Sequence, residues 1–163
     1  MELQDYISKY GNIEVEEKQL NELLNIKESK VWKPNRGDEY YYIYADGDIK
    51  KLIYCGAHYD NDCLLLGNVY QTKEEAEFAV EKRKIEIELQ RYADEHNDEI
   101  DWNNCNQWKF YIFYDCFNKK IYIDCYLTYK SNDVYFTSKE IAEQAIEAIG
   151  EERLKKYYFR MED

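Results

Sequence analysis

Residues of the kind that could do chemistry gather between positions 55 and 62 of the chain. Asp60 and Asp62, with His58 beside them, offer carboxylate oxygens and an imidazole to a hard metal ion, as in a metal-dependent nuclease. An EF-hand loop would also need glycine at its sixth position and glutamate at its twelfth, and neither is present. Because acidic pairs are common in a chain with 34 Asp and Glu residues, we interpret these carboxylates as ordinary acids and expect no metal site.

Cys55 and His58 could form a second constellation, a thiol nucleophile with its base. They come from an expected strand and an expected loop, where residues three apart face different ways, and no G-x-S-x-G or cysteine-protease signature accompanies them. The six glycines stand alone, so both Gly-rich phosphate-loop patterns are missing. We therefore expect no catalytic residues, no enzyme activity and no cofactor.

The composition is that of an acidic protein of one ordinary domain. The chain has 163 residues, of which 45% are apolar, and a net charge of −12, which argues against direct binding to a nucleic-acid backbone. No run of about 18 apolar residues occurs, and the start lacks the basic and apolar regions of a signal peptide. The five cysteines are odd in number and include no C-x-x-C pair, which is typical of free thiols. The expected location is the cytoplasm.

The elements that must position any site begin with an N-terminal arm, residues 1–31. Apolar residues recur at spacings of three and four over residues 14–30, and acids precede lysines along this segment, so a helix is expected there. This helix packs on its own domain or forms a dimer seam. Pro34 and Gly37 then mark a turn.

The first half of the remaining chain spans residues 32–100. Its expected elements are, in order, strands over 39–44 and 49–55, a polar loop through His58, Asp60, Asn61 and Asp62, a short strand over 69–70 and a helix over 73–96. Asp46 and Gly47 fit the hairpin turn between the first two strands. Thr72, with Glu75 three residues later, predicts a capping box at the start of the helix.

The second half, residues 101–163, repeats this order. Its expected elements are strands over 108–114, 121–129 and 134–136 and a helix over 139–156. Residues 72–80 align without gaps to residues 138–146, with five of nine positions identical. The expected fold is therefore α+β: two duplicated strand-strand-strand-helix units with antiparallel sheet, preceded by an N-terminal helix, together making one compact domain.

Tyrosine is the most unusual feature of the composition, with 18 residues. Exposed tyrosine gives a large contact area at low entropic cost and favours protein recognition, whereas stacking on nucleic-acid bases is opposed by the net charge. An aromatic surface rimmed by acids suits a basic protein partner. The predicted partner-binding residues are tyrosines of the first strand and acids of the long helix, which equally fit a solvated helix face: Tyr40, Tyr42, Tyr44, Glu74, Glu75, Glu77, Glu81, Glu86 and Glu88.

Three motifs carry a resemblance to a known group of proteins. Trp32-x-Pro34 followed by G-D-E-Y-Y-Y-I at 37–43, G-N-V-Y-x-T-K-E-E-A at 67–76 and V-Y-F-x-S-K-E-x-A at 134–142 resemble small accessory proteins of phages and prophages of low-GC Gram-positive bacteria. The likeness covers residues 31–159, and its motifs are structural rather than catalytic.

By analogy, this resemblance implies a stoichiometric inhibitor of host defence of the anti-CRISPR type. Its partner would be a host protein, such as a Cas nuclease or its nucleic-acid-bound complex, with no membrane and no direct nucleic-acid binding. The alternative function is a structural or regulatory phage module that acts by self-association, for example as a homodimer. A small-molecule-binding domain is a further alternative.

Overall fold

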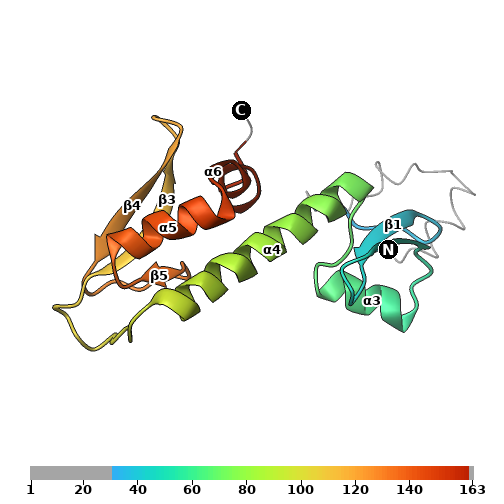
Figure 1. Cartoon of the computed structure of the whole chain (residues 1–163). Coiled ribbons are helices and arrows are strands. Elements are labelled where there is room, and N and C mark those ends of the chain that lie inside the picture. The colour runs from blue at the N-terminus through green and yellow to red at the C-terminus, as the bar shows by residue number, and fades with distance from the viewer. Residues whose placement is uncertain (1–30, 162–163) are drawn as a thin grey trace, which may run out of the picture. The chain divides into compact units, whose positions relative to one another are not determined.

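Figure 1 shows the structure, a computed structural model that describes residues 31–161. The helix predicted over residues 14–30, and nearly all of the predicted arm, lie outside the described residues. The chain divides into two units, and the second, Pro34–Asp163, holds all the helices and strands named below. This unit confirms the α+β class, because it combines helices with two antiparallel sheets of two and three strands.

The first sheet is a hairpin of β1 (Glu39–Ile43) and β2 (Ile49–Ile53), which confirms the predicted pair of strands. The turn between them needs a left-handed residue, and Gly47 supplies it with φ +90°. The predicted short strand at 69–70 is reduced to one bridge, in which Tyr41 and Tyr70 exchange two backbone hydrogen bonds of 2.9 Å.

The prediction of a loop after β2 is wrong, because this segment forms helix α3 (His58–Leu65). Asp60, at the third position of the helix, accepts hydrogen bonds from the backbone N–H groups of Cys55 and Ala57. The bond from Ala57 pairs the N–H of the N-cap residue, and the bond from Cys55 ties the preceding chain to the start of the helix. The buried carboxylate of Asp60 therefore stabilises the start of a helix that the polar sequence did not predict.

Helix α4 (Lys73–His96) has the bounds that the sequence predicted. The backbone N–H of Glu75 donates to Thr72 Oγ1 at 3.2 Å, and the Glu75 carboxylate accepts from the Thr72 backbone N–H at 3.2 Å. This reciprocal pair confirms the predicted capping box. Ser138 caps the later helix α5 (Lys139–Ile149) in the same way, since its Oγ accepts from the Ile141 N–H at 3.2 Å.

Replacing Thr72 with alanine is expected to lower the free energy of unfolding by about 1 kcal/mol, because one N–H of the first turn of α4 loses its acceptor. Ser138→Ala should cost a similar amount at α5, and Thr72→Ser should cost little. Urea denaturation of the three variants measures these differences. Equal stability of Thr72→Ala and the native chain would contradict the capping role.

The second sheet has the strand order β4-β3-β5, from β3 (Lys109–Asp115), β4 (Lys120–Tyr126) and β5 (Tyr135–Phe136). β4 pairs with β3 one residue to one along its whole length, from Lys120 opposite Asp115 to Tyr126 opposite Lys109. β5 pairs with the other edge of β3, with Tyr135 opposite Tyr111. Among the described residues 31–161, β4 therefore has a neighbouring strand on one side only.

The single helix predicted over residues 139–156 is wrong in its length. Gly150 interrupts it with φ +96°, a conformation that side chains with Cβ rarely adopt. The chain continues as a short helix α6 (Glu151–Arg153) and a π-helical turn η1 (Leu154–Tyr158). This turn buries Leu154 and packs against α4.

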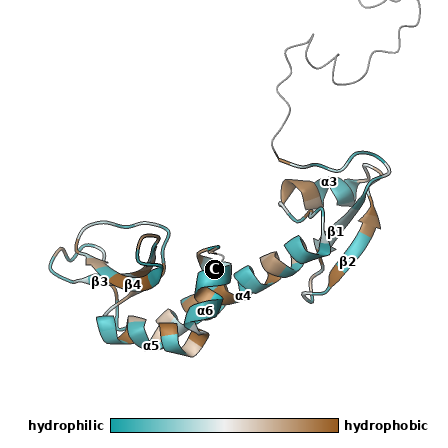
Figure 2. Ribbon diagram, turned by 90° about the horizontal axis from the view of Figure 1, so that it is seen from above, coloured by the Kyte–Doolittle hydropathy of each residue, from teal (hydrophilic) through white to brown (hydrophobic). Residues whose placement is uncertain are grey.

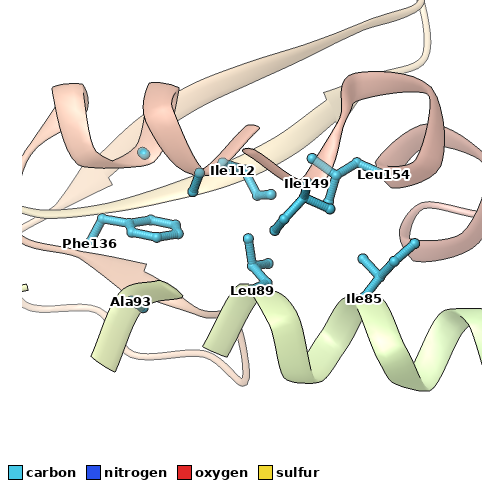
Figure 3. Packing of buried hydrophobic residues seen from close by; sticks show 9 residues of the cluster. Ile85, Leu89, Ala93, Ile112, Phe136, Ile149 and Leu154 are labelled. Carbon is cyan, nitrogen blue, oxygen red and sulfur yellow. The ribbon is translucent and has the colours of Figure 1, made fainter. Parts of the chain in front are cut away.

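The hydrophobic core lies between the second sheet and the helices that cover one of its faces (Figure 3). Ile112 and Phe136 point from the sheet toward Leu89 of α4 and Ile149 of α5. In Figure 2, α5 lies along one face of the β3–β4 hairpin, in agreement with the contacts between these elements. The other face of the sheet is turned away from this core.

Candidate functional site

The carboxylate of Asp60 is a structural group at the start of α3. The side chain is buried, and it accepts hydrogen bonds from Tyr40 Oη at 2.8 Å and from the Cys55 thiol at 3.3 Å, besides its two backbone donors. Burial alone would raise the pKa of Asp60, but these hydrogen bonds outweigh burial and lower the pKa to about 2. Asp60 is thus a fully bonded anion that ties the β1–β2 hairpin to α3.

His58 and Asp62 lie on the surface of the same helix and do not join Asp60. His58 Nε2 is 3.6 Å from Asp62 Oδ2, and both side chains are largely exposed. Within residues 31–161, no group of three or more histidine, cysteine, aspartate or glutamate side chains is placed to hold a metal ion. The thiol of Cys55, the other candidate for chemistry, donates to Asp60.

Two of the three tyrosines predicted to bind a partner are buried. Tyr40 is fully buried and Tyr42 nearly so, because the face of β1 that they share packs toward α3, where Tyr42 meets Tyr59 with ring centroids 5.5 Å apart. Only Tyr44 of the three is exposed, beneath the ammonium of Lys50. Tyr40 and Tyr42 are therefore removed from the surface that a partner could contact.

The acids predicted to bind a partner along α4 largely have cationic or capping partners within the chain. The bonded acids are Glu75 in the capping box, Glu77 with Lys73 at 2.9 Å, Glu81 with Lys84 at 2.7 Å, Glu86 with Lys82 at 3.3 Å and Glu88 with Arg153 at 2.9 Å. Glu74 is exposed and lines a groove. Lysines and an arginine interleave with these acids, so α4 does not present a continuous acidic stripe.

An aromatic surface lies instead on the face of the second sheet that is turned away from the core. It consists of Tyr111 and Phe113 of β3, Tyr122 and Tyr126 of β4, and Tyr129, and we call it the aromatic face. Tyr122, Tyr126 and Tyr129 are 40%, 38% and 58% exposed, while the two β3 rings are half-buried. Exposed rings in a contiguous group are typical of recognition surfaces.

The rings of the aromatic face stack against one another. The rings of Tyr111 and Tyr126 are parallel within 7° at a centroid distance of 5.0 Å, and Phe113 and Tyr122 stack at 6.0 Å. Tyr129 meets Tyr126 edge-on at 5.1 Å. Since each stacked ring has one π face covered by its neighbour, the surface offers ring edges and hydroxyl groups to a ligand.

The phenol of Tyr111 is neutral at physiological pH. Burial raises the pKa of Tyr111, and the hydrogen bond that its hydroxyl donates to Tyr126 Oη at 3.1 Å raises this pKa further. The Tyr111 hydroxyl thus remains a hydrogen-bond donor and acceptor rather than a charge.

A second layer of side chains supports the aromatic face near β5. Tyr135, which is buried, packs against Tyr111 and against the ring of Trp102, 5.0 Å away. Lys109 is fully buried here, and its ammonium donates to the backbone carbonyls of residues 104, 107 and 127 at 2.9–3.2 Å. These contacts hold the segment before β3 and the segment after β4 in place, so the aromatic face is a preorganised surface.

A groove of about 810 Å³ lies along α4, with Ile43 and Phe78 among its apolar lining residues. Its charged lining is mixed: Lys82, Arg83 and Arg160 alternate with three glutamates, and Lys82 is already paired with one of them. This lining selects no single charge type of ligand.

The sequence places Ile121, Ile123 and Cys125 together on one face of their strand, and the structure shows them half-buried. The same alternation puts Tyr122 and Tyr126 on the opposite face, and this is the signal in the sequence that could have located the aromatic face.

Within residues 31–161, no helix is both long and apolar enough to cross a membrane. Comparison of the chain with family models, curated proteins and solved structures finds no match.

Proposed function

We propose that this protein acts without catalysis, by binding another protein in a stoichiometric complex through its aromatic face. The observation that carries the proposal is the group of rings on β3 and β4, partly exposed and held by a buried second layer. Tyrosine buries much area for little lost side-chain entropy, so a rigid cluster of this kind is suited to serve as a binding hot spot.

A protein is favoured over a nucleic acid as the partner for two reasons. The chain carries a net charge of −12, which repels phosphates, and Asp115 and Asp124 lie on the same face as the rings. Each stacked ring also has one of its two π faces covered by its neighbour, which reduces the ring area open to base stacking. Ring edges, hydroxyl groups and carboxylates suit a basic protein surface instead.

The partner class that fits this chemistry is a nucleic-acid enzyme, whose own substrate groove is basic. Together with the resemblance to phage accessory proteins, this supports a host-defence nuclease of the CRISPR kind as the target, met in the cytoplasm of the host cell. Acids and hydroxyl groups near the rings would then occupy positions that phosphates take in the substrate.

The second candidate function, self-association of a structural or regulatory module, is favoured by a different observation. β4 is an open edge of its sheet, seven residues long and without a bulge. Open edges of this kind pair with other strands.

The duplication predicted from the sequence is also part of this proposal. In the aligned halves, Tyr41 and Tyr70 correspond to Phe110 and Phe136. The first pair forms the isolated bridge next to β1, and the second pair joins β3 to β5. Each pairing is followed by a helix with a hydroxyl cap. This common order supports two copies of one ancestral unit, although the second hairpin is longer.

The proposed function is tested by using the tagged chain to capture its partner protein from a low-GC Gram-positive host that carries an active CRISPR system. The tagged full chain should retain a nucleic-acid enzyme in near-equal amount, and a variant with Tyr122 and Tyr126 replaced by serine should not. Equal recovery by the two chains would contradict binding through the aromatic face. Recovery of the bait alone would contradict the proposed partner class in that host.

A further inference from the structure

The open edge of β4 has the features of a strand that pairs with another chain. All seven of its residues are paired with β3 on one side, and no strand within residues 31–161 lies on the other side. Neither a proline nor a bulge interrupts it, which are two common means of protecting an edge. The backbone is therefore regular along the full length of β4. The backbone N–H of Cys125 donates to the Asp124 carboxylate at 2.8 Å, and a second strand would have to replace this bond.

The side chains of β4 are less buried than their neighbours on β3. Ile121, Ile123 and Cys125 point toward the core but remain half-buried, whereas Ile112 in the adjacent strand is buried. On the other face, Tyr122 and Tyr126 are exposed. A strand added beside β4 would cover apolar surface on both faces of the sheet.

We propose that two copies of this chain join along their β4 strands, antiparallel, with Ile123 on the twofold axis. In this register every residue of β4 faces a residue of the second copy: Lys120 faces Tyr126, Ile121 faces Cys125, Tyr122 faces Asp124 and Ile123 faces itself. Residues directly opposite in an antiparallel pair point to the same face, so apolar residues meet on the core side.

The charges of β4 are complementary to themselves when the strand is reversed. Lys120 and Asp124 of the second copy become diagonal neighbours, a spacing that a lysine side chain can span. The twofold axis makes this contact twice. No like charges lie directly opposite each other, and the two Asp124 side chains form one like-charge diagonal pair beside the two opposite-charge pairs. Because these charge contacts arise when β4 pairs with an antiparallel copy of itself, a second copy of the chain is favoured over an unrelated strand.

The edge of β2 provides an internal contrast. β2 also has one neighbouring strand, but it carries the adjacent lysines Lys50 and Lys51. Antiparallel self-pairing about Lys51 would place the Lys51 side chains of the two copies opposite each other, and like charges directly opposite are destabilising. The structure thus assigns the self-pairing edge to β4 and not to β2.

The proposed pairing extends the sheet and leaves the two aromatic faces on the same side, because the twofold axis is perpendicular to the sheet. Tyr122 of each copy would lie near the axis. A dimeric chain would then present one larger surface, with twice the number of rings, to a partner. This inference rests on the edge of β4 and stands without the proposed partner.

Sedimentation equilibrium of the full chain over about 1–100 µM tests the inference. The mass of the native chain should rise from 19.9 kDa toward twice that value. Asp124→Lys should raise the dissociation constant of the dimer at least about tenfold, because each Lys120 then meets a lysine. The double variant Lys120→Asp/Asp124→Lys restores opposite charges and should recover the native constant within about threefold.

Three outcomes would overturn the proposed dimer: a native chain that remains monomeric over this range, Asp124→Lys dimerising as well as the native chain, or a charge-swapped variant as weak as Asp124→Lys. Circular dichroism of each variant confirms that the fold is intact. A monomeric native chain that still captures a nucleic-acid enzyme would reject the dimer alone, and a dimer that captures none would reject the proposed function alone.

Discussion

Replacing Asp60 with asparagine is expected to lower the free energy of unfolding by about 2–4 kcal/mol. The buried carboxylate accepts from Tyr40 Oη and from the backbone N–H groups of Cys55 and Ala57. An amide of the same size can keep its oxygen on the two backbone N–H groups, but its NH2 group then faces the Tyr40 hydroxyl, whose hydrogen loses its acceptor. The remaining bonds also lose the charge of the carboxylate, and hydrogen bonds to a charged acceptor are about twice as strong as neutral ones.

The matched control for this variant is Asp62→Asn, two residues later on the same helix. Asp62 is half exposed and pairs only with His58 across 3.6 Å, so its replacement should change stability by less than about 0.5 kcal/mol. Urea denaturation at pH 7 measures both variants. Similar stabilities for the two would contradict the structural role of Asp60.

The contribution of Asp60 to stability should also depend on pH. Its pKa is lowered to about 2 in the folded chain and is about 3.9 in an unfolded chain. The folded state therefore holds the ionised form more strongly. The resulting stability is present above the unfolded pKa and is lost as the pH falls from about 4 to about 2. The difference in stability between the native chain and Asp60→Asn should shrink over this range.

The double variant Tyr122→Ser/Tyr126→Ser is expected to bind the partner protein at least about 100-fold more weakly than the native chain. Both rings are more than a third exposed, and each stacks on a ring of β3, so together they make up much of the accessible part of the aromatic face. Isothermal titration with the captured enzyme measures the change in the dissociation constant.

Two controls separate loss of the surface from loss of the fold. Tyr122→Phe/Tyr126→Phe keeps both rings and should weaken binding far less than the serine variant does. Tyr44→Ser/Tyr59→Ser removes two tyrosines that are 45% and 46% exposed in the first half of the chain, outside the aromatic face. If this second pair weakened binding as strongly, the partner would contact the first half instead.

Elements with local sequence signals were the ones that could be predicted. The α4 helix has its capping box at Thr72 and a non-helical Asn97 at its end, and both bounds were correct. The two hairpins were found from segments rich in aromatic residues and from the turn residues between them, such as Asp46 and Gly47. Such signals lie within a few residues of the structure that they specify.

Apart from the helix that Gly150 interrupts, the errors arose where structure depends on contacts distant in the sequence. Helix α3 has a polar surface, and Asp60 at its start is held in part by Tyr40, twenty residues earlier. The alternation of tyrosines in β1 and β4 was visible in the sequence, but which face another element covers was not. In β1 the face that carries Tyr40 and Tyr42 packs toward α3, whereas the tyrosines of β4 lie on a face turned away from the core.

The most direct test of the proposed function is a titration of the captured nucleic-acid enzyme with the purified full chain, followed by cleavage of its substrate. Stoichiometric binding predicts that cleavage falls linearly and ends near one chain per enzyme, and that the Tyr122→Ser/Tyr126→Ser variant leaves cleavage unchanged at the same ratio. Loss of cleavage at a small fraction of one chain per enzyme would indicate turnover, and would contradict an account in which this protein acts only by binding.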